Sequence, residues 1–310
     1  MANYRVISSD NHVFEPPDLW TSRAKPAFKD RVPQLVREYD GDWWFCDGHR
    51  VIGLAAGTQT GMRFEEPEKL VRTTTFDKVR RGGYDPAEHV KDMDADDVDV
   101  SIVYPTVGLL MYSVPDSAFL SELFRGYNDW LAEFCAGEPK RLKGIAMINV
   151  DDVQEGVKEL ERCAKMGLAG GMITVYPPEG KGYDNPMYEP LWAAAQDLDI
   201  PLGMHIATNR PGPGQDFALE DRNRVRNSFL ANAPLGADVS CRHDLQRRLR
   251  ALSKTPGRHR GARTVLDSPL PEPHRLYLYP AGPAGALSVQ GSHAAQRLFP
   301  PQCVCGLPGG

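Results

Sequence analysis

The residues best suited to chemistry are a carboxylate and an imidazole at the end of an apolar run. Asp10 and His12 are separated by one residue and follow the β-branched run YRVIS. Because side chains alternate along a strand, residues two apart project from the same side. A carboxylate and an imidazole that project together suit a divalent cation such as zinc or manganese. By itself, this short motif also occurs as a helix cap or a surface pair.

A second histidine strengthens the metal hypothesis. His205 lies inside the apolar run IPLGMHIAT, where a polar side chain is costly unless it has a partner. One interpretation is a hydrogen-bonded core histidine. The other is a third ligand for a cation held by Asp10 and His12, which requires that the ends of two distant strands converge, as they do in a barrel.

The elements that must position these residues alternate along the chain. Short apolar runs predict strands at 4–10, 100–106, 142–150, 169–177 and 200–208, and amphipathic spacing predicts helices at 86–99, 116–137, 152–167 and 187–199. This alternation predicts βαβ units and a parallel sheet. A doubly wound sheet and a TIM barrel both fit. No G-x-G-x-x-G follows the first strand, which disfavours a dinucleotide-binding fold.

One long excursion, residues 13–85, interrupts the alternation. It contains Asp40-Gly41 and Asp47-Gly48 between short aromatic or apolar runs, a pattern typical of hairpin turns. The pattern predicts an inserted β-meander at about 34–55. Within it, Trp44 is a candidate for substrate contact, and the alternative is that Trp44 belongs to the small core of a lid.

Composition bounds the class of protein. The chain has 310 residues, 41% hydrophobic and 25% charged, as in soluble globular proteins. No run approaches the ~18 apolar residues of a membrane span, and the first residues lack the features of a signal peptide. We therefore expect a cytoplasmic protein. Residues 1–240 hold 26 Lys and Arg against 38 Asp and Glu (net −12), whereas residues 241–310 hold 10 against 3 (net +7).

The motifs before residue 240 resemble those of the amidohydrolase-related family, which includes aminocarboxymuconate-semialdehyde decarboxylase and γ-resorcylate decarboxylase. The segments that carry the resemblance are VISSDNHVFEPPDLW, KDMDADDVDVSIVYPT, NDWLAEFC, RLKGIAMINV, NPMYEPLWAAAQDLDIPLGMHIAT and NRPGPGQ. The resemblance implies a (β/α)8 TIM barrel of the metal-dependent hydrolase type that holds one divalent metal, zinc or manganese. It also implies hydrolysis or decarboxylation of a small carboxylate or aromatic substrate, and homodimers among intact members.

The same resemblance suggests roles for individual residues. Asp10, His12 and His205 match the family's metal ligands on the first and fifth strands. Asn209 and Arg210 lie in a loop similar to a substrate-facing loop, although Arg210 equally fits a surface charge. The family also expects a histidine after the sixth strand and an aspartate after the eighth. Residues 241–310 contain neither motif, so no catalytic residue is assigned.

The amino-acid sequence after Ser240 suggests why those motifs are missing. Codons compatible with CRHDLQRRLRAL, read one base later, encode Ala-Asp-Met-Ile-Phe-Ser-Gly-Val-Phe-Glu-Arg, which resembles the family's next helix. A shifted reading also restores a strand ending in Glu-His, with the histidine encoded across Ala262 and Arg263. The pattern favours a frameshift near Ser240, by the gain of one base or the loss of two.

We therefore predict an incomplete barrel of about five strands over residues 1–240, followed by a non-native, disordered tail over 241–310. Such a chain is expected to be poorly stable and to have crippled activity, because five strands leave edges unpaired. Two alternatives remain open. The chain is a non-catalytic barrel remnant, or its Arg-rich tail is a genuine nucleic-acid-binding arm.

Overall fold

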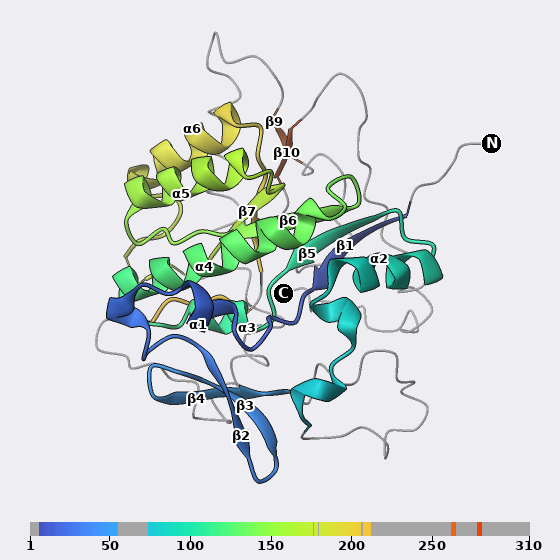
Figure 1. Cartoon of the computed structure of the whole chain (residues 1–310). Coiled ribbons are helices and arrows are strands. Elements are labelled where there is room, and N and C mark those ends of the chain that lie inside the picture. Colours follow the sequence, from blue (N-terminus) through green and yellow to red (C-terminus); the bar gives the residue numbers. More distant parts are fainter. Residues whose placement is uncertain are drawn as a thin grey trace, which may run out of the picture.

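The computed structural model describes residues 6–54, 74–175, 177–178, 180–205 and 207–211, and the backbone of 262–264 and 278–280. Its centre is a five-stranded sheet in the order β1-β5-β6-β7-β8, and every neighbouring pair is parallel (Figure 1). The strands are β1 (Ile7–His12), β5 (Val100–Tyr104), β6 (Leu142–Met147), β7 (Gly170–Ile173) and β8 (Leu202–Met204). The predicted parallel α/β architecture is confirmed.

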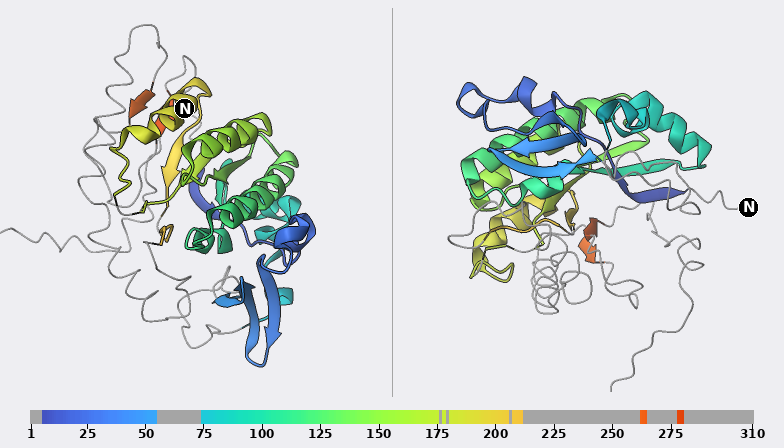
Figure 2. Two further views of the ribbon diagram at one scale, coloured as in Figure 1. Left: turned by 90° about the vertical axis from the view of Figure 1, so that its left-hand side faces the viewer. Right: turned by 90° about the horizontal axis from the view of Figure 1, so that it is seen from below.

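The sheet curls strongly from one edge to the other. In a flat sheet, four inter-strand spacings would separate β1 from β8 by about 19 Å. Nevertheless, Asp10 Oδ1 on β1 lies 3.3 Å from Nε2 of His205, the residue directly after β8. This closeness requires a sheet bent into part of a barrel, and Figure 2 shows the curvature with the helices on its outer side. The predicted incomplete barrel of five strands is confirmed for the described residues.

Helices α2 (Pro86–Ala95), α4 (Ser117–Ala136), α5 (Val153–Lys165) and α6 (Glu189–Asp197) connect successive strands. An aspartate begins each of the first three, because its carboxylate accepts hydrogen bonds from the otherwise unpaired N–H groups of the first turn. These caps are Asp85, Asp116 and Asp152. Each predicted helix exists, with ends at most four residues inside the predicted range.

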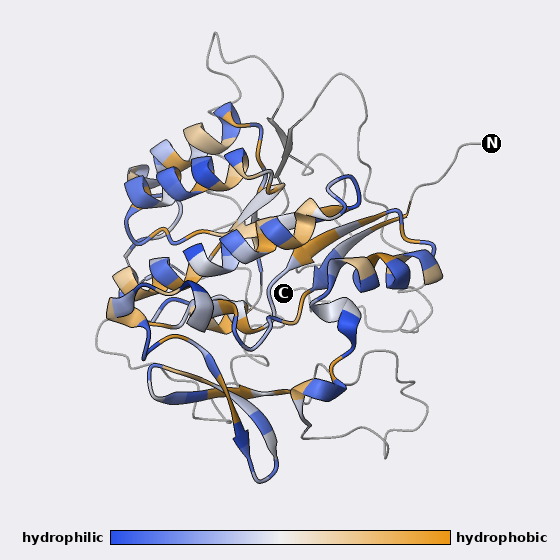
Figure 3. Ribbon diagram, viewed as in Figure 1, coloured by the Kyte–Doolittle hydropathy of each residue, from blue (hydrophilic) through white to orange (hydrophobic). Residues whose placement is uncertain are grey.

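Helix α5 illustrates how the sequence determines burial. Val153, Gly156, Leu160 and Cys163 are buried and follow the three- and four-residue spacing of one helix face. The opposite face carries charged residues, and Figure 3 shows the corresponding mixture of hydrophilic and hydrophobic residues along this helix. The buried face packs toward the sheet and toward α6, so the helix is held by the burial of apolar side chains.

The excursion after β1 contains the expected three-stranded antiparallel meander: β2 (Gln34–Glu38), β3 (Gly41–Cys46) and β4 (His49–Gly53). At the second turn, Asp47 has φ 51° and Gly48 has φ 77°. Two successive residues with positive φ match the tight hairpin turn that an Asp-Gly pair favours. Residues 55–73 of the same excursion lie outside the described residues.

Several short elements had no sequence prediction. They are α1 (Leu19–Arg23), α3 (Val107–Met111) and the 3-10 turns Pro26–Phe28, Phe76–Lys78, Arg81–Gly83 and Pro186–Tyr188. In the described part of the chain, no helix is both long and apolar enough to cross a membrane.

Two short segments of the tail, which was predicted to be disordered, form strands. Strands β9 (Ala262–Thr264) and β10 (Leu278–Pro280) pair antiparallel in a sheet of their own. They do not continue the parallel sheet. The remainder of 241–310, and therefore most of the predicted domain division, lies outside the described residues.

Candidate metal centre

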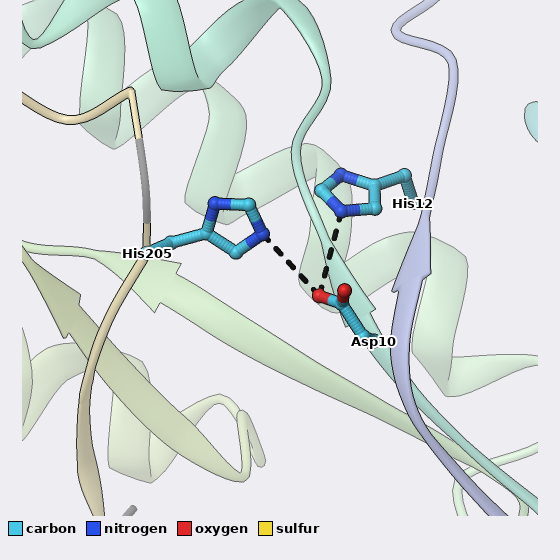
Figure 4. Close-up of side chains that lie close together, drawn as sticks. All are labelled: Asp10, His12 and His205. Carbon is cyan, nitrogen blue, oxygen red and sulfur yellow. Dashed lines mark hydrogen bonds and ion pairs between the residues drawn. The ribbon is translucent and has the colours of Figure 1, made fainter. Parts of the chain in front are cut away.

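The three predicted ligands meet at the carboxyl ends of the two edge strands. Asp10 Oδ1 lies 3.5 Å from His12 Nε2 and 3.3 Å from His205 Nε2. One ligand atom from each residue falls within 4.8 Å of the others, as a single cation requires. Figure 4 shows both imidazole rings directing a nitrogen at the same carboxylate oxygen. The residues that the sequence singled out are thus brought together from 195 positions apart.

A polar network behind β1 supports this end of the site. The pairing of β1 with β5 shifts register between Ser8 and Asn11. Asn11 Nδ2 donates to Ser101 Oγ (2.6 Å) and its Oδ1 accepts from Ser8 Oγ (2.9 Å). His89 on α2 contacts the same Ser101 hydroxyl at 3.1 Å. Because Asn11 is anchored to β5, its neighbours Asp10 and His12 are held with a fixed direction.

His12 is already in the tautomer that a metal ligand needs. Its Nδ1 lies 2.7 Å from the carbonyl oxygen of Pro105, so this nitrogen carries the proton that it donates. Nε2 then presents its lone pair toward Asp10 Oδ1. Burial lowers the pKa of the His12 imidazole, although the Pro105 hydrogen bond and the charge of Glu15 both raise it. A neutral imidazole and a carboxylate oxygen are two acceptors, and a cation between them would relieve their repulsion.

His205 is positioned by a turn that closes directly after β8. Thr208 Oγ1 donates to the His205 carbonyl oxygen at 2.6 Å, and Val175 N–H after β7 donates to the Thr208 carbonyl oxygen at 2.9 Å. The His205 ring packs beside Tyr104, with ring centroids 5.3 Å apart. Its side chain is 13% exposed. The histidine is therefore neither a free surface residue nor an isolated core residue.

A cavity of about 360 Å³ reaches His12 from the α2 side of β1. Its lining includes Ser8, Phe14, Arg80 and His89 together with His12. Asp10 and His205 do not line this cavity, and the His12 side chain is 30% exposed.

The predicted substrate-binding residues lie elsewhere or stay untested. Trp44 has no exposed surface and packs edge-on against Trp20, with ring centroids 5.7 Å apart. It therefore anchors the meander to α1, as the lid-core alternative expected, and the structure does not offer it to a ligand. Asn209 Oδ1 is buried and has no hydrogen-bond partner among the described residues, and a contact between Asn209 and substrate remains a prediction.

Arg210 is also occupied within the fold. Its Nε and Nη2 donate to the two carboxylate oxygens of Asp151, and Nη1 donates to the carbonyl oxygens of Tyr112 and Val114. Its side chain is only 5% exposed. Arg210 thus clamps the loop after β8 to Asp151 and to the segment that follows α3. It is not a surface charge, and the suggested contact with substrate stays a prediction.

Sequence reasoning missed three residues around the cluster: Pro105, Tyr104 and Glu15. The first supplies the carbonyl oxygen to His12, and the second packs beside both imidazole rings, which themselves lie 5.0 Å apart. Glu15 is completely buried and is bonded to the turn that follows β5. An acidic residue inside the otherwise uncharged run HVFEPP was the available signal.

A curled parallel sheet with a carboxylate–imidazole cluster at its strand ends places the chain among the α/β-barrel proteins. The model of one such family, described as amidohydrolase, matches residues 43–256, which is more than half of the sequence. The chain therefore belongs to the amidohydrolase family. Of the three clustered residues, His205 lies within the match, and residues 257–310 lie beyond it.

Curated relatives cover only part of the chain. It is 33% identical over 115 residues to a γ-resorcylate decarboxylase of Rhizobium radiobacter, covering 35% of this chain and 34% of the relative. It is 25% identical over 132 residues to the 2-amino-3-carboxymuconate-6-semialdehyde decarboxylase of Dictyostelium discoideum, covering 42% and 36%. The matches thus span about a third of the length of these relatives, which are named as enzymes.

Among solved structures, an amidohydrolase from Mycobacterium avium subsp. paratuberculosis K-10 superposes with a TM-score of 0.55 and 19% identity. The match covers 82% of this chain and 68% of that one. This likeness supports the barrel fold.

Proposed function

We propose that Asp10, His12 and His205 bind one divalent cation, zinc or manganese. The observation that carries this proposal is the shared approach of two imidazole nitrogens to one carboxylate oxygen, while the other nitrogen of His12 is committed to a carbonyl. One oxygen and two nitrogen donors form a ligand set suited to either metal. Within the residues described, the cluster has three members, so a bound cation would keep coordination positions for water or substrate.

The reaction that we propose is the decarboxylation of a small aromatic or related carboxylate. The names of the two curated relatives favour decarboxylation over hydrolysis, which remains the alternative within the same family. A bound cation would polarise a substrate oxygen and stabilise negative charge on it. The chain's own contribution would be to hold His12 and His205 rigidly, through Pro105 and Thr208, in a partly buried site where electrostatic interactions are strong.

We further propose that this chain is a weakened form of such an enzyme, with its reading frame lost near Ser240. The reversal from net −12 to net +7 at that point supports this proposal. The alternatives are a non-catalytic remnant and a protein that binds nucleic acid through the tail. We also propose that the protein acts on a small-molecule substrate, is located in the cytoplasm and, in its intact form, assembles as a homodimer.

The activity is tested by CO2 release from γ-resorcylate, with and without added Mn²⁺. We expect slow, metal-dependent release that His205→Ala abolishes. His49→Ala, which removes an imidazole from the meander, is the control and should keep the wild-type rate. Equal rates with and without metal, or in the His205→Ala variant, would exclude the proposed reaction at this site.

Resequencing the gene tests the frame. If the shifted reading frame encodes a strand-like sequence that ends in the expected histidine, the original gene product is an intact enzyme. If the present frame is confirmed, the remnant interpretation is correct. A salt-sensitive nucleic-acid affinity that disappears on deletion of residues 241–310 would instead favour the binding arm.

A further inference from the structure

Glu15 is a buried carboxylate close to the candidate metal centre that contributes no ligand to it. Its side chain has no exposed surface. Oε1 accepts hydrogen bonds from the backbone N–H groups of Thr106 (3.1 Å) and Gly108 (2.8 Å), and Oε2 accepts one from Val107 (3.0 Å). Thr106 is the last residue before α3, and Val107 and Gly108 are its first two residues, so the donors lie where the chain turns from β5 into α3. Glu15 therefore fixes the conformation of this turn.

The same turn presents the carbonyl group that orients His12. Pro105 directly precedes the three donors, and its oxygen accepts the Nδ1–H of His12 at 2.7 Å. Two further bonds join the same segments: Val13 N–H donates to Tyr104 O (2.9 Å), and Thr106 Oγ1 donates to Val13 O (2.7 Å). Residues 12–15 and 104–108 are thus connected continuously, with His12 at one end and Glu15 at the other.

We propose that Glu15 is a positioning residue that fixes the Pro105 carbonyl and thereby holds His12 in the tautomer with a free Nε2. The inference rests on the proposed cation site, because it concerns the geometry of one of its ligands. Glu15 is not a member of the ligand cluster, and its oxygens already accept from three backbone donors.

The charge of Glu15 would favour a cation bound by His12, although it also raises the pKa of the His12 imidazole, which burial lowers. Burial raises the pKa of the Glu15 carboxyl, and the backbone donors oppose this shift. Three N–H groups converging on two oxygens are the environment of a carboxylate, and an ionised carboxylate near His12 favours positive charge at that position. A cation bound by His12 would benefit from this buried negative charge because water screens it little.

The test uses Glu15→Gln in the full chain, because this change preserves side-chain size while it replaces one acceptor oxygen by a donor. We expect Mn²⁺ affinity to fall about 10- to 100-fold, as for other residues that orient metal ligands. Glu122→Gln is the matched control: Glu122 is also buried, at 8% exposure, but its partner is Lys25, which donates from its backbone N–H (2.9 Å) and pairs through Nζ (2.8 Å). It should leave the affinity unchanged.

A second readout is independent of metal. The ¹⁵N chemical shifts of His12 in metal-free protein report its tautomer: we expect a single Nδ1–H form in the wild type and in Glu122→Gln, and a mixture of tautomers in Glu15→Gln. If Glu15→Gln does not fold, Thr106→Val, which removes one link of the same connection, should give a smaller change in the same direction.

The outcomes separate the two proposals. Absence of Mn²⁺ binding by the wild type would refute the cation site, whereas the tautomer of His12 would still test Glu15. Unchanged affinity and an unchanged tautomer in the folded variant would overturn the positioning role. An equal loss in Glu122→Gln would also overturn it, because the effect would then be general destabilisation.

Discussion

The Arg210–Asp151 clamp gives a prediction whose size follows from the structure. Asp151→Ala removes both carboxylate oxygens that receive Arg210 Nε and Nη2, while the guanidinium stays buried at 5% exposure. Two charge-assisted hydrogen bonds at about 1.5–3 kcal/mol each amount to roughly 3–6 kcal/mol, and breaking a buried ion pair from one side typically costs about 3–5 kcal/mol. We therefore expect a loss of about 3–5 kcal/mol in the free energy of unfolding.

Urea unfolding followed by circular dichroism measures this loss. Because small domains have about 5–15 kcal/mol of total stability, the variant should lose most of its cooperative transition. Glu155→Gln is the control, since it breaks an exposed pair with Lys158 and should leave the transition unchanged. The double variant Asp151→Leu/Arg210→Met should be more stable than Asp151→Ala, because no unpaired charge remains. A loss below about 1 kcal/mol for Asp151→Ala would refute the buried clamp.

Three further predictions concern the lid, acid stability and pH-dependent binding. Trp44→Ala should cost about 3–5 kcal/mol in urea unfolding while leaving the Mn²⁺ affinity of the folded protein unchanged, because Trp44 is a core residue. Arg31 lowers the pKa of Asp47, and the hydrogen bond from Phe119 N–H together with Arg31 lowers the pKa of Asp116. The contribution of both carboxylates to stability is therefore present above the unfolded pKa near 3.9 and is lost as pH falls through the lower folded values. Unfolding midpoints between pH 6 and pH 3 should accordingly fall more steeply in the wild type than in Arg31→Gln. Calorimetry should show that Mn²⁺ affinity falls when the pH drops below the histidine pKa values, because protons then compete with the metal for the imidazole nitrogens. Each imidazole should contribute a loss of up to about 10-fold per pH unit. Burial lowers the pKa of His12, so its part of the loss should occur at lower pH.

The strands and helices could be predicted because their signals are local. Buried parallel strands are continuous apolar runs, and the Asp caps and helical spacing mark the helices between them. The observed strands are shorter than predicted: 200–208 reduces to Leu202–Met204, because the apolar run continues into the turn that carries His205. Asp10, His12 and His205 could be inferred as a group only through the assumption that the strand ends converge.

Residue roles that depend on distant partners could not be predicted. A tryptophan such as Trp44 suits a core or a binding surface equally well. Its contact with Trp20, from another part of residues 13–85, makes it a core residue. Arg210 is buried because Asp151 lies 59 positions away in sequence but at bonding distance. Glu15 reads as part of a loop, since the donors that surround it lie more than 90 positions later.

The central claim is that Asp10, His12 and His205 form one cation site, and calorimetric titration of Mn²⁺ into the chelator-treated full chain tests it most directly. We predict one site per chain, weaker than the roughly 10–16 kcal/mol of structural zinc sites, that disappears in both Asp10→Asn and His205→Ala but persists in His49→Ala. Absence of binding by the wild type, or wild-type affinity in Asp10→Asn and His205→Ala, would contradict the account.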